Sequence, residues 1–437
     1  MKRVLLLINS GLRKLIDKGF FHILIGNTLV KCISLCSAIF LPRIIVPESA
    51  YGMLTTVDNV NSYLILLNGL GLSNSVLRYC SMQKTQGKKS AIFRFCLKYG
   101  VLADGLILVI FIPLLLFSGL FTNGNYGAAK EYILFASLIP VTTYLVDVYL
   151  LYMRANLLNK TFSKVSVIYS LLYAGLQVIM AFICFINGVY IGRYLALTTV
   201  AVICYVTLCK KNILIKPEPE EILSWSDKRE MFRYGIGCMI TNTFSLIMPL
   251  NETWVVNTVL VNLDTTAFYK AASMIPSNLQ YIATSVVVFI YPYFAQNGEN
   301  MKWVKKNIWR LLAGMCGLMI PIIALCYWLS PYIIIYIYGE NYAPAITIMR
   351  PMWIAFGVNA ILRIPLGNVL AAMGKLRFNI ALSAVISLMH FGLDFYFIKN
   401  LGIGGAAYAL MITYTFSSIC SIVYIIRMTR RGTVDAE

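Results

Sequence analysis

Apolar runs of about 20 residues recur along the chain from residue 20 to residue 426, separated by short polar connections. Each run is long enough to cross a hydrocarbon core of about 30 Å as a helix, and in lipid the backbone must satisfy its polar groups internally. The composition agrees, because 59% of the residues are hydrophobic and only 13% are charged. The sequence therefore predicts an all-α polytopic membrane protein with no segment left for a soluble domain.

The limits of the runs predict twelve spans in two halves. The spans lie near residues 21–43, 51–77, 96–119, 131–153, 165–187, 190–208, 234–258, 266–294, 310–330, 346–371, 379–398 and 404–426. The longest polar stretch follows the sixth span. We therefore predict an N-terminal six-helix half at residues 1–208, a cytoplasmic linker at 209–233 and a C-terminal six-helix half at 234–437.

Lys and Arg gather on alternate connections: before the first span, after each even-numbered span and at the C-terminus. By the positive-inside rule, this bias predicts that both termini are cytoplasmic. Residues 2–18 predict an interfacial amphipathic helix rather than a cleaved signal peptide, because the apolar stretch there is short and no small-residue cleavage site follows. Membrane topology thus accounts for the formal charge of +19, and nucleic acid is not an expected partner.

Four predicted spans, the first two of each half, carry polar stripes at helical spacing. A charge near the bilayer centre costs about 2.5–3.5 kcal/mol on insertion scales, so these stripes predict a hydrated cavity where the halves meet. Lys31 and Lys270 are candidates to bind an anionic substrate, and Asp58 and Glu252 are candidates to pair with them or to carry a coupling ion. The stripes are Asn27, Lys31 and Ser34; Asp58, Asn61 and Asn68; Asn242, Ser245 and Glu252; and Lys270, Ser273, Ser277, Gln280 and Thr284.

Each candidate also has a structural interpretation. Lys270 could extend to the membrane interface, and Lys31 could form a purely structural pair with Asp58. Arg43 stands at a span end, where an anchoring role is common, whereas Arg363 could line the cavity wall or bind headgroups. A further stripe, Ser383, Ser387, His390 and Asp394, could be a proton relay or a packed helix–helix hydrogen bond.

No motif predicts an enzyme, a cofactor or a metal site. The chain has no nucleophile elbow, no phosphate-binding loop and no large external loop of the kind that a membrane glycan polymerase would need. Its eleven Cys residues lie within predicted spans or on the cytoplasmic side, which does not predict disulfides. We therefore expect no catalytic residues.

Several short motifs occur in a characteristic order. They are Leu41-Pro-Arg43, Tyr51-Gly52, Asn68-Gly-Leu-Gly-Leu72 before Arg78-Tyr79, Tyr152-Met-Arg154-Ala155, Phe268-Tyr-Lys-Ala271 with Tyr291-Pro292, and Leu401-Gly-Ile-Gly-Gly-Ala-Ala407. In this order the chain resembles the bacterial polysaccharide flippases, within the superfamily that also holds multidrug exporters of the toxic-compound extrusion type. The resemblance covers nearly the whole chain, although each motif alone is a degenerate packing or turn signal.

The resemblance implies two six-helix bundles around a central cavity, and alternating access across the bacterial cytoplasmic membrane. The implied substrate is an oligosaccharide on undecaprenyl pyrophosphate, for O-antigen, capsule or exopolysaccharide synthesis. Lys31 and Lys270 occupy fitting positions for the cationic cavity of that family, and Arg43 or Arg363 could assist. Coupling to protons or sodium, and partners such as a glycan polymerase and a chain-length regulator, would follow. An ion-coupled multidrug exporter, a transporter of another lipid-linked glycan, and a glycan polymerase or ligase are the alternatives.

Overall fold

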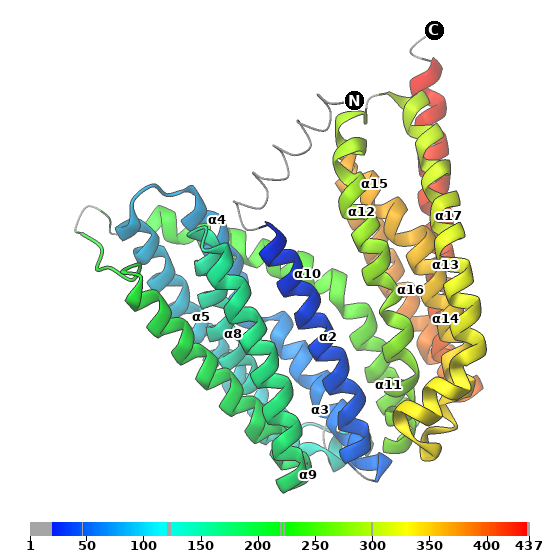
Figure 1. Cartoon of the computed structure of the whole chain (residues 1–437), viewed down its shortest axis with the longest axis horizontal. Helices are drawn as coiled ribbons and strands as arrows, with labels where there is room; N and C mark the ends of the chain where they lie inside the picture. The colour runs from blue at the N-terminus through cyan, green and yellow to red at the C-terminus, as the bar shows by residue number, and fades with distance from the viewer. Residues whose placement is uncertain are drawn as a thin grey trace. The chain divides into compact units, whose positions relative to one another are not determined.

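The computed structural model describes residues 20–45, 47–119, 124–218, 221, 223–298 and 300–434. The chain divides into two compact units, Met1–Thr243 (unit 1) and Phe244–Glu437 (unit 2). Helices account for nearly all of the described residues, and no strand occurs among them (Figure 1). The predicted all-α fold class is confirmed. The predicted interfacial helix at residues 2–18 lies outside the described residues.

Unit 1 is a bundle of long helices joined by short turns. Its elements are α2 (Phe20–Ile44), α3 (Glu48–Leu66), the 3-10 turn η1 (Asn68–Gly71), α4 (Leu72–Met82), α5 (Gln86–Phe117), α6 (Gly124–Ala128), α7 (Lys130–Ala136), α8 (Ile139–Ala155), α9 (Asn159–Lys210) and the first part of α10 (Trp225–Val259). The start of α10 belongs to this unit because it is bonded to α4: the Ser75 hydroxyl donates to the Met231 carbonyl (2.8 Å) and the Tyr79 hydroxyl to Glu230 (3.0 Å).

Unit 2 contains the rest of α10 and the C-terminal helices. These are α11 (Leu263–Ser277), α12 (Leu279–Gln296), α13 (Met301–Tyr338), the 3-10 turn η4 (Glu340–Tyr342), α14 (Ala345–Val358), the π-helical turn η5 (Asn359–Arg363), α15 (Ile364–Ala372), α16 (Leu376–Leu401), the 3-10 turn η6 (Gly402–Gly404) and α17 (Gly405–Val434). Apolar side chains of α12, α13, α15 and α17 form one of its cores.

Two helical hairpins are packed closely through glycine. In α9 the reversal lies at Cys184–Phe185, and Gly188 and Gly192 then pack against backbone of the preceding helix so closely that a Cβ would clash. The Leu401–Gly405 turn between α16 and α17 uses Gly405 against the Phe397 backbone in the same way. Both antiparallel hairpins therefore depend on close backbone approach that only glycine permits.

Two of the predicted spans are interrupted rather than continuous. The second breaks at η1, where Gly69 and Gly71 have positive φ and the Gly69 N–H donates to Asp104 (2.6 Å). The eighth breaks after Ser277, one residue past Pro276, which cannot donate a helical hydrogen bond. The predicted stripe from Lys270 to Thr284 is consequently divided between α11 and α12.

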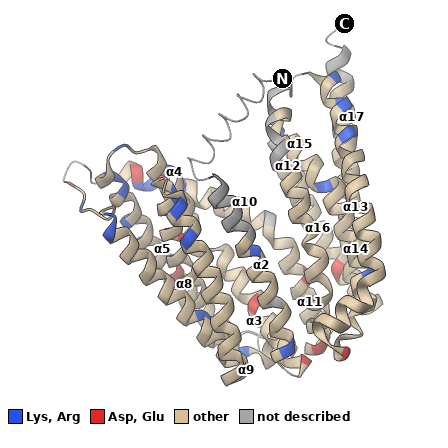
Figure 2. Ribbon diagram, in the orientation of Figure 1, with Lys and Arg blue, Asp and Glu red and all other residues tan. Residues whose placement is uncertain are grey.

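Six helical segments of the described residues are long and apolar enough to cross a membrane. Several of their hydroxyl groups bond within the helix, as when Thr207 and Ser387 donate to the carbonyls of Ile203 and Ser383 (2.6 and 2.9 Å). Lys and Arg gather toward the ends of α4 and α5 in unit 1 and of α17 in unit 2 (Figure 2). The chain is therefore a multi-pass membrane protein.

Candidate functional site

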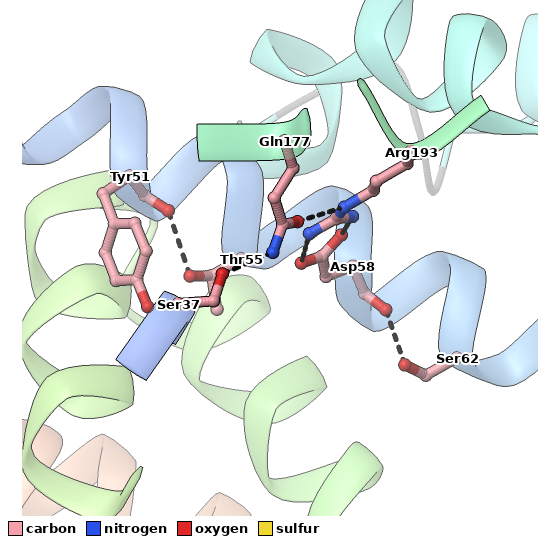
Figure 3. Close-up of polar contacts among 7 residues, drawn as sticks. All are labelled: Ser37, Tyr51, Thr55, Asp58, Ser62, Gln177 and Arg193. Atoms are coloured by element: carbon pink, nitrogen blue, oxygen red, sulfur yellow. Dashed lines mark hydrogen bonds and ion pairs between the residues drawn. The ribbon is translucent and has the colours of Figure 1, made fainter. Parts of the chain in front are cut away.

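A charged network lies within the helices of unit 1 (Figure 3). The Arg193 guanidinium on α9 forms a two-pronged ion pair with Asp58 on α3: Nη2 donates to Oδ2 at 2.9 Å, and Nη1 contacts Oδ1. Arg193 Nε donates to the Gln177 side-chain oxygen (3.0 Å), and the Gln177 amide donates to the Ser37 hydroxyl on α2 (2.6 Å). The network therefore joins three helices of the unit.

The hairpin within α9 places Arg193 opposite Gln177. The reversal at Cys184–Phe185 leaves both residues about two turns from the bend, on facing helices. The guanidinium also lies 5.7 and 5.6 Å from the ring centroids of Tyr173 and Tyr190, where the negative ring faces attract a cation. All three guanidinium nitrogens (Nε, Nη1 and Nη2) thus have an acceptor, as a buried cation requires.

The network gives Asp58 a partner that sequence analysis did not single out. The Arg193 side chain is 8% exposed and that of Asp58 37%, so the acid forms the accessible side of the pair. Lys31 on α2 and Arg43 at its end are both exposed, and each makes further contacts. Asn27 lies where side chains are not described. Arg193 could have been found from its rarity, since few basic residues fall inside an apolar run.

Unit 2 contains a second group of charged residues, centred on the α10 carboxyl group of Glu252. Glu252 is 2% exposed and lies beside the Tyr269 hydroxyl, with the exposed Lys270 as the neighbouring positive charge on α11. The predicted candidates Glu252 and Lys270 are therefore brought together. Ser273 and Ser277 direct their hydroxyl protons to carbonyls of their own helix, Lys270 and Met274 (3.3 and 2.7 Å).

His390 and Asp394 on α16 form a fully buried pair in the same unit, with 3.2 Å between Nε2 and Oδ2. On the other side of the ring, Nδ1 lies 3.3 Å from the Thr413 hydroxyl, which itself donates to the Ala409 carbonyl (2.7 Å). Because the Thr413 hydroxyl proton is donated to Ala409, this hydroxyl can only accept from His390. Nδ1 must therefore be the protonated nitrogen that donates to it. Nε2 therefore faces the Asp394 carboxyl group, and a single proton between these two atoms can lie on either of them.

Several acceptors of this group have no hydrogen-bond donor among the described residues. They are Oε1 of Glu252 and both carboxyl oxygens of Asp394, and His390 Nε2 likewise makes no hydrogen bond there. Buried polar atoms are normally satisfied, and exceptions often mark a functional position. We call Glu252, His390 and Asp394 the acid cluster. It offers buried acceptors that a proton would satisfy.

Arg363 is half-buried at the π-helical turn η5 and faces a polar cavity of about 300 Å³. One of its nitrogens contacts the Asn359 side-chain oxygen (3.4 Å), and the guanidinium lies 5.3 Å from the Tyr414 ring centroid. Tyr414 is also reached by the charges of Glu252 and Asp394. Arg363 therefore borders the cavity and packs on the Tyr414 ring.

The fold and these charged groups define the class of protein: a multi-pass helical membrane protein with buried ionisable groups in each of two helical units. Residues 40–347 match the polysaccharide biosynthesis protein family, and the chain belongs to that family.

The chain is also similar to individual proteins in sequence or in fold. A Shigella flexneri protein named "Putative O-antigen transporter" is 22% identical over 204 residues, which is 44% of this chain and 48% of that protein. The chain thus aligns with about half the length of this relative. Among solved structures, the inward closed lipid II flippase MurJ has a TM-score of 0.73 at 15% identity, covering 94% of this chain and 90% of its own. An inward-facing multidrug resistance MATE family transporter of the MOP superfamily has a TM-score of 0.75 at 14% identity, covering 93% and 96%.

Proposed function

We propose that this protein is a flippase that moves undecaprenyl-pyrophosphate-linked oligosaccharide repeat units across the bacterial cytoplasmic membrane by alternating access. The product would serve O-antigen, capsule or exopolysaccharide synthesis. The observation that carries this proposal is the family match over residues 40–347. Relatives named for O-antigen transport and lipid II flipping support a lipid-linked glycan as the substrate. Both termini would lie in the cytoplasm, and a glycan polymerase and a chain-length regulator would act on the product.

The chemistry of this substrate requires fixed cations. A pyrophosphate loses its hydration on entering a membrane, and the transporter must replace it with positive charge and hydrogen-bond donors while the polyprenyl tail stays in lipid. Lys31 and Lys270, both exposed, would supply that charge. Arg43, Arg363, Asn27, Ser273 and Ser277 would assist. No chemical step is needed, which fits a transporter rather than an enzyme.

The acid cluster would couple transport to an ion gradient. Glu252 and Asp394 present buried carboxyl oxygens without donors, and His390 shares a proton position with Asp394. Occupancy of this group by protons or sodium would alter the charge buried in unit 2 and so bias its conformation. Asp58 is the second coupling candidate, with Arg193 as its counter-charge.

The sidedness of lipid-linked glycan in cells lacking the gene tests the function. Intact and lysed cells are treated with a glycan-modifying enzyme, and the repeat units are quantified by mass spectrometry. A flippase predicts single units that accumulate only on the cytoplasmic face. Accumulation outside without polymerisation would identify a polymerase or ligase instead.

Two substitutions test the cationic site within the same assay. Lys31→Ala and Lys270→Ala should each lower surface glycan at normal membrane expression, whereas Lys302→Ala, an exposed cation at the start of α13, should not. If both variants keep wild-type glycan, these lysines do not bind the substrate, although family membership stands.

An ion-coupled multidrug exporter is the second candidate. The buried carboxyl groups of Glu252 and Asp394 favour it, because an acidic site suits cationic drugs, and so does the fold shared with a MATE transporter. Drug susceptibility of the deletion strain separates the two functions. Increased sensitivity to cationic drugs with normal glycan sidedness would replace the flippase proposal.

A further inference from the structure

An apolar groove lies between α13 and α14, which pack side by side in unit 2 (Figure 1). Its volume is about 430 Å³, and the described residues that line it are all apolar or aromatic. A groove with this lining suits a hydrocarbon chain rather than a polar ligand. The lining residues are Ile320, Ile323, Ala324 and Tyr327 of α13, and Ile354, Gly357, Val358 and Ile361 of α14 and η5.

The groove is deep because glycine forms part of its floor. Gly357 is buried, and a Cβ at this position would come within 2.5 Å of the end of the Ile323 side chain. Ile320 and Ile354 stand at the rim and are 55% and 43% exposed, whereas Ile361 is 9% exposed. Both helices belong to segments that are long and apolar enough to cross a membrane. The exposed isoleucines therefore favour lipid chains as the neighbours of the groove.

One end of the groove lies toward the membrane interface. Tyr327 is the lining residue of α13 nearest the turn to α14, and the exposed residues Trp328, Tyr332 and Tyr336 follow it one helical turn apart. Trp and Tyr on the outside of a span form the aromatic belt that marks the headgroup level. Residues 320–327 cover two turns of helix, so the groove runs about 10 Å from this level toward the membrane interior.

A cation stands at the same end of the groove. Arg350 lies on α14 one turn before Ile354, and its guanidinium carbon is 5.6 Å from the Tyr327 ring centroid. The residue is exposed, and apart from this ring contact it has no hydrogen bond or ion pair with a described residue. A guanidinium has five N–H donors in a planar fork, and stacking on an aromatic ring keeps that fork ordered. Arg350 is therefore available to an anion at the headgroup level.

We propose that the groove and Arg350 form a binding site for an anionic phospholipid of the surrounding membrane, with one acyl chain in the groove and the lipid phosphate on the guanidinium. The lipid belongs to the leaflet nearest the turn between α13 and α14. Arginine pairs bidentately with phosphate, and a zwitterionic lipid offers a phosphate that its own ammonium group already compensates. The proposal goes beyond the proposed function and does not depend on it.

A bound lipid would support the backbone break in the tenth predicted span. Val358 is the last residue of α14, and Ile361 lies within the π-helical turn η5. An acyl chain in the groove would contact both residues and so pack against the break. A ligand that binds only the folded state stabilises it, so occupancy should raise the melting temperature.

Lipid binding to the full-length protein, measured by native mass spectrometry from detergent micelles, tests the role of the charge. Dioleoyl-phosphatidylglycerol is the probe, and dioleoyl-phosphatidylcholine has the same chains with a zwitterionic headgroup. Wild type should prefer the first lipid. Arg350→Gln should weaken phosphatidylglycerol binding at least about tenfold, as expected for charge-assisted hydrogen bonds. Lys399→Gln, which removes an exposed cation at the end of α16, should leave it unchanged. Equal affinity of wild type for the two lipids, or wild-type affinity in Arg350→Gln, would overturn the site.

A second pair of variants tests the groove. Ala324 is an exposed lining residue, so Ala324→Phe places a ring in the groove without disturbing the core. Binding of both lipids should fall at least about fourfold, the value of one methylene group kept out of the groove. Leu325→Phe, at an exposed neighbouring position outside the groove, should bind both lipids as wild type does. Unchanged binding by Ala324→Phe would show that the chain lies elsewhere and would overturn the site.

Photolabelling locates the lipid and identifies its kind. Phosphatidylglycerol with a diazirine near the end of one chain should label peptides that contain residues 320–327 and 354–361. Label confined to other helices would contradict the proposal. Loss of this label on addition of farnesyl phosphate at equal concentration would identify a site for prenyl phosphates and overturn the assignment to a membrane phospholipid.

Thermal unfolding gives an independent measurement. Added phosphatidylglycerol should raise the melting temperature of wild type more than that of Arg350→Gln, and equal shifts in the two proteins would contradict the proposal. None of these measurements involves glycan, so a negative result would leave the proposed flippase function standing. Failure of the sidedness assay would likewise leave the lipid site standing.

Discussion

Arg193 in unit 1 and Arg363 in unit 2 are the same side chain in two different settings. Arg193 is paired with the Asp58 carboxylate and bonded to Gln177, whereas Arg363 contacts only an amide oxygen and an aromatic ring among the described residues and borders a cavity. The acids near Arg363 also keep carboxyl oxygens without donors. A buried charge that is fully satisfied holds helices together, and one that is incompletely satisfied is available to bind. The comparison assigns structural support to the first network and ligand binding to the second.

The largest effect is expected from breaking the satisfied pair. Asp58→Asn leaves the Arg193 guanidinium buried without a counter-charge, which should lower the free energy of unfolding by about 3–5 kcal/mol. Thermal unfolding of the purified full-length protein measures this. The double variant Asp58→Leu with Arg193→Met removes both charges and should recover much of the loss. Wild-type stability of Asp58→Asn together with abolished transport would instead make Asp58 a coupling residue.

Substitution in the acid cluster should lower transport and leave stability nearly unchanged, in contrast to Asp58→Asn. Glu252→Gln preserves the shape of the side chain and removes an acid that has an unbonded oxygen, so stability should stay close to wild type. Transport should fall about 5- to 150-fold, the usual range of coupling between sites. Surface glycan and thermal unfolding are measured on the same variant. A strongly destabilised Glu252→Gln with normal transport per folded molecule would show that the acid is structural.

The predicted spans and the observed helices differ most clearly at the hairpin of α9. The apolar runs predict two spans joined after residue 187, which leaves Arg193 at a span end. The structure instead reverses at Cys184–Phe185, so Arg193 lies about 12 Å along the second helix. The glycines at 188 and 192 mark close helix packing and not the bend. The pairing with Asp58 depends on this register, which periodicity alone does not specify.

The predictions that succeeded are those that depend on composition and local chemistry. Long apolar runs are sufficient to predict an all-α membrane fold, and a carboxyl group deep in such a run, as at Glu252, is costly enough to be noticed. Glu252 and Lys270 come together because α10 and α11 are joined by a short turn. The approach of Arg363 to Tyr414 requires the packing of η5 against α17, which no local pattern encodes.

A smaller effect is expected from the amide that supports Arg193. Gln177→Leu removes the hydrogen bonds to Arg193 Nε and to Ser37 but leaves the ion pair with Asp58. The free energy of unfolding should fall by about 1–3 kcal/mol, less than in Asp58→Asn, because the charge stays neutralised. Chemical or thermal unfolding of Gln177→Leu and Asp58→Asn, measured side by side, shows which variant loses more stability. Gln177→Glu is the matched control, since its carboxylate could still accept from Arg193. A loss in Gln177→Leu equal to that in Asp58→Asn would mean that the amide, and not the charge pair, holds the network.

The smallest effect on stability is expected from a carboxylate outside the membrane, that of Glu221. Its contribution is a reference against which those of the buried carboxylates can be compared. The Glu218 N–H donates to the Glu221 carboxylate (3.1 Å), and this bond, with others from Thr85 and the Lys88 N–H, lowers the pKa of Glu221. Gly87 leaves room for this carboxylate at the start of α5, where a Cβ would clash with it. A lowered pKa in the folded state means that the carboxylate stabilises the protein above its unfolded pKa of about 4.3 and that the contribution is lost as pH falls through the folded value. The melting temperature of wild type should therefore drop slightly more than that of Glu221→Gln on acidification from pH 6 to pH 3. Identical slopes would show that this exposed contact contributes nothing, in contrast to the pair between Asp58 and Arg193.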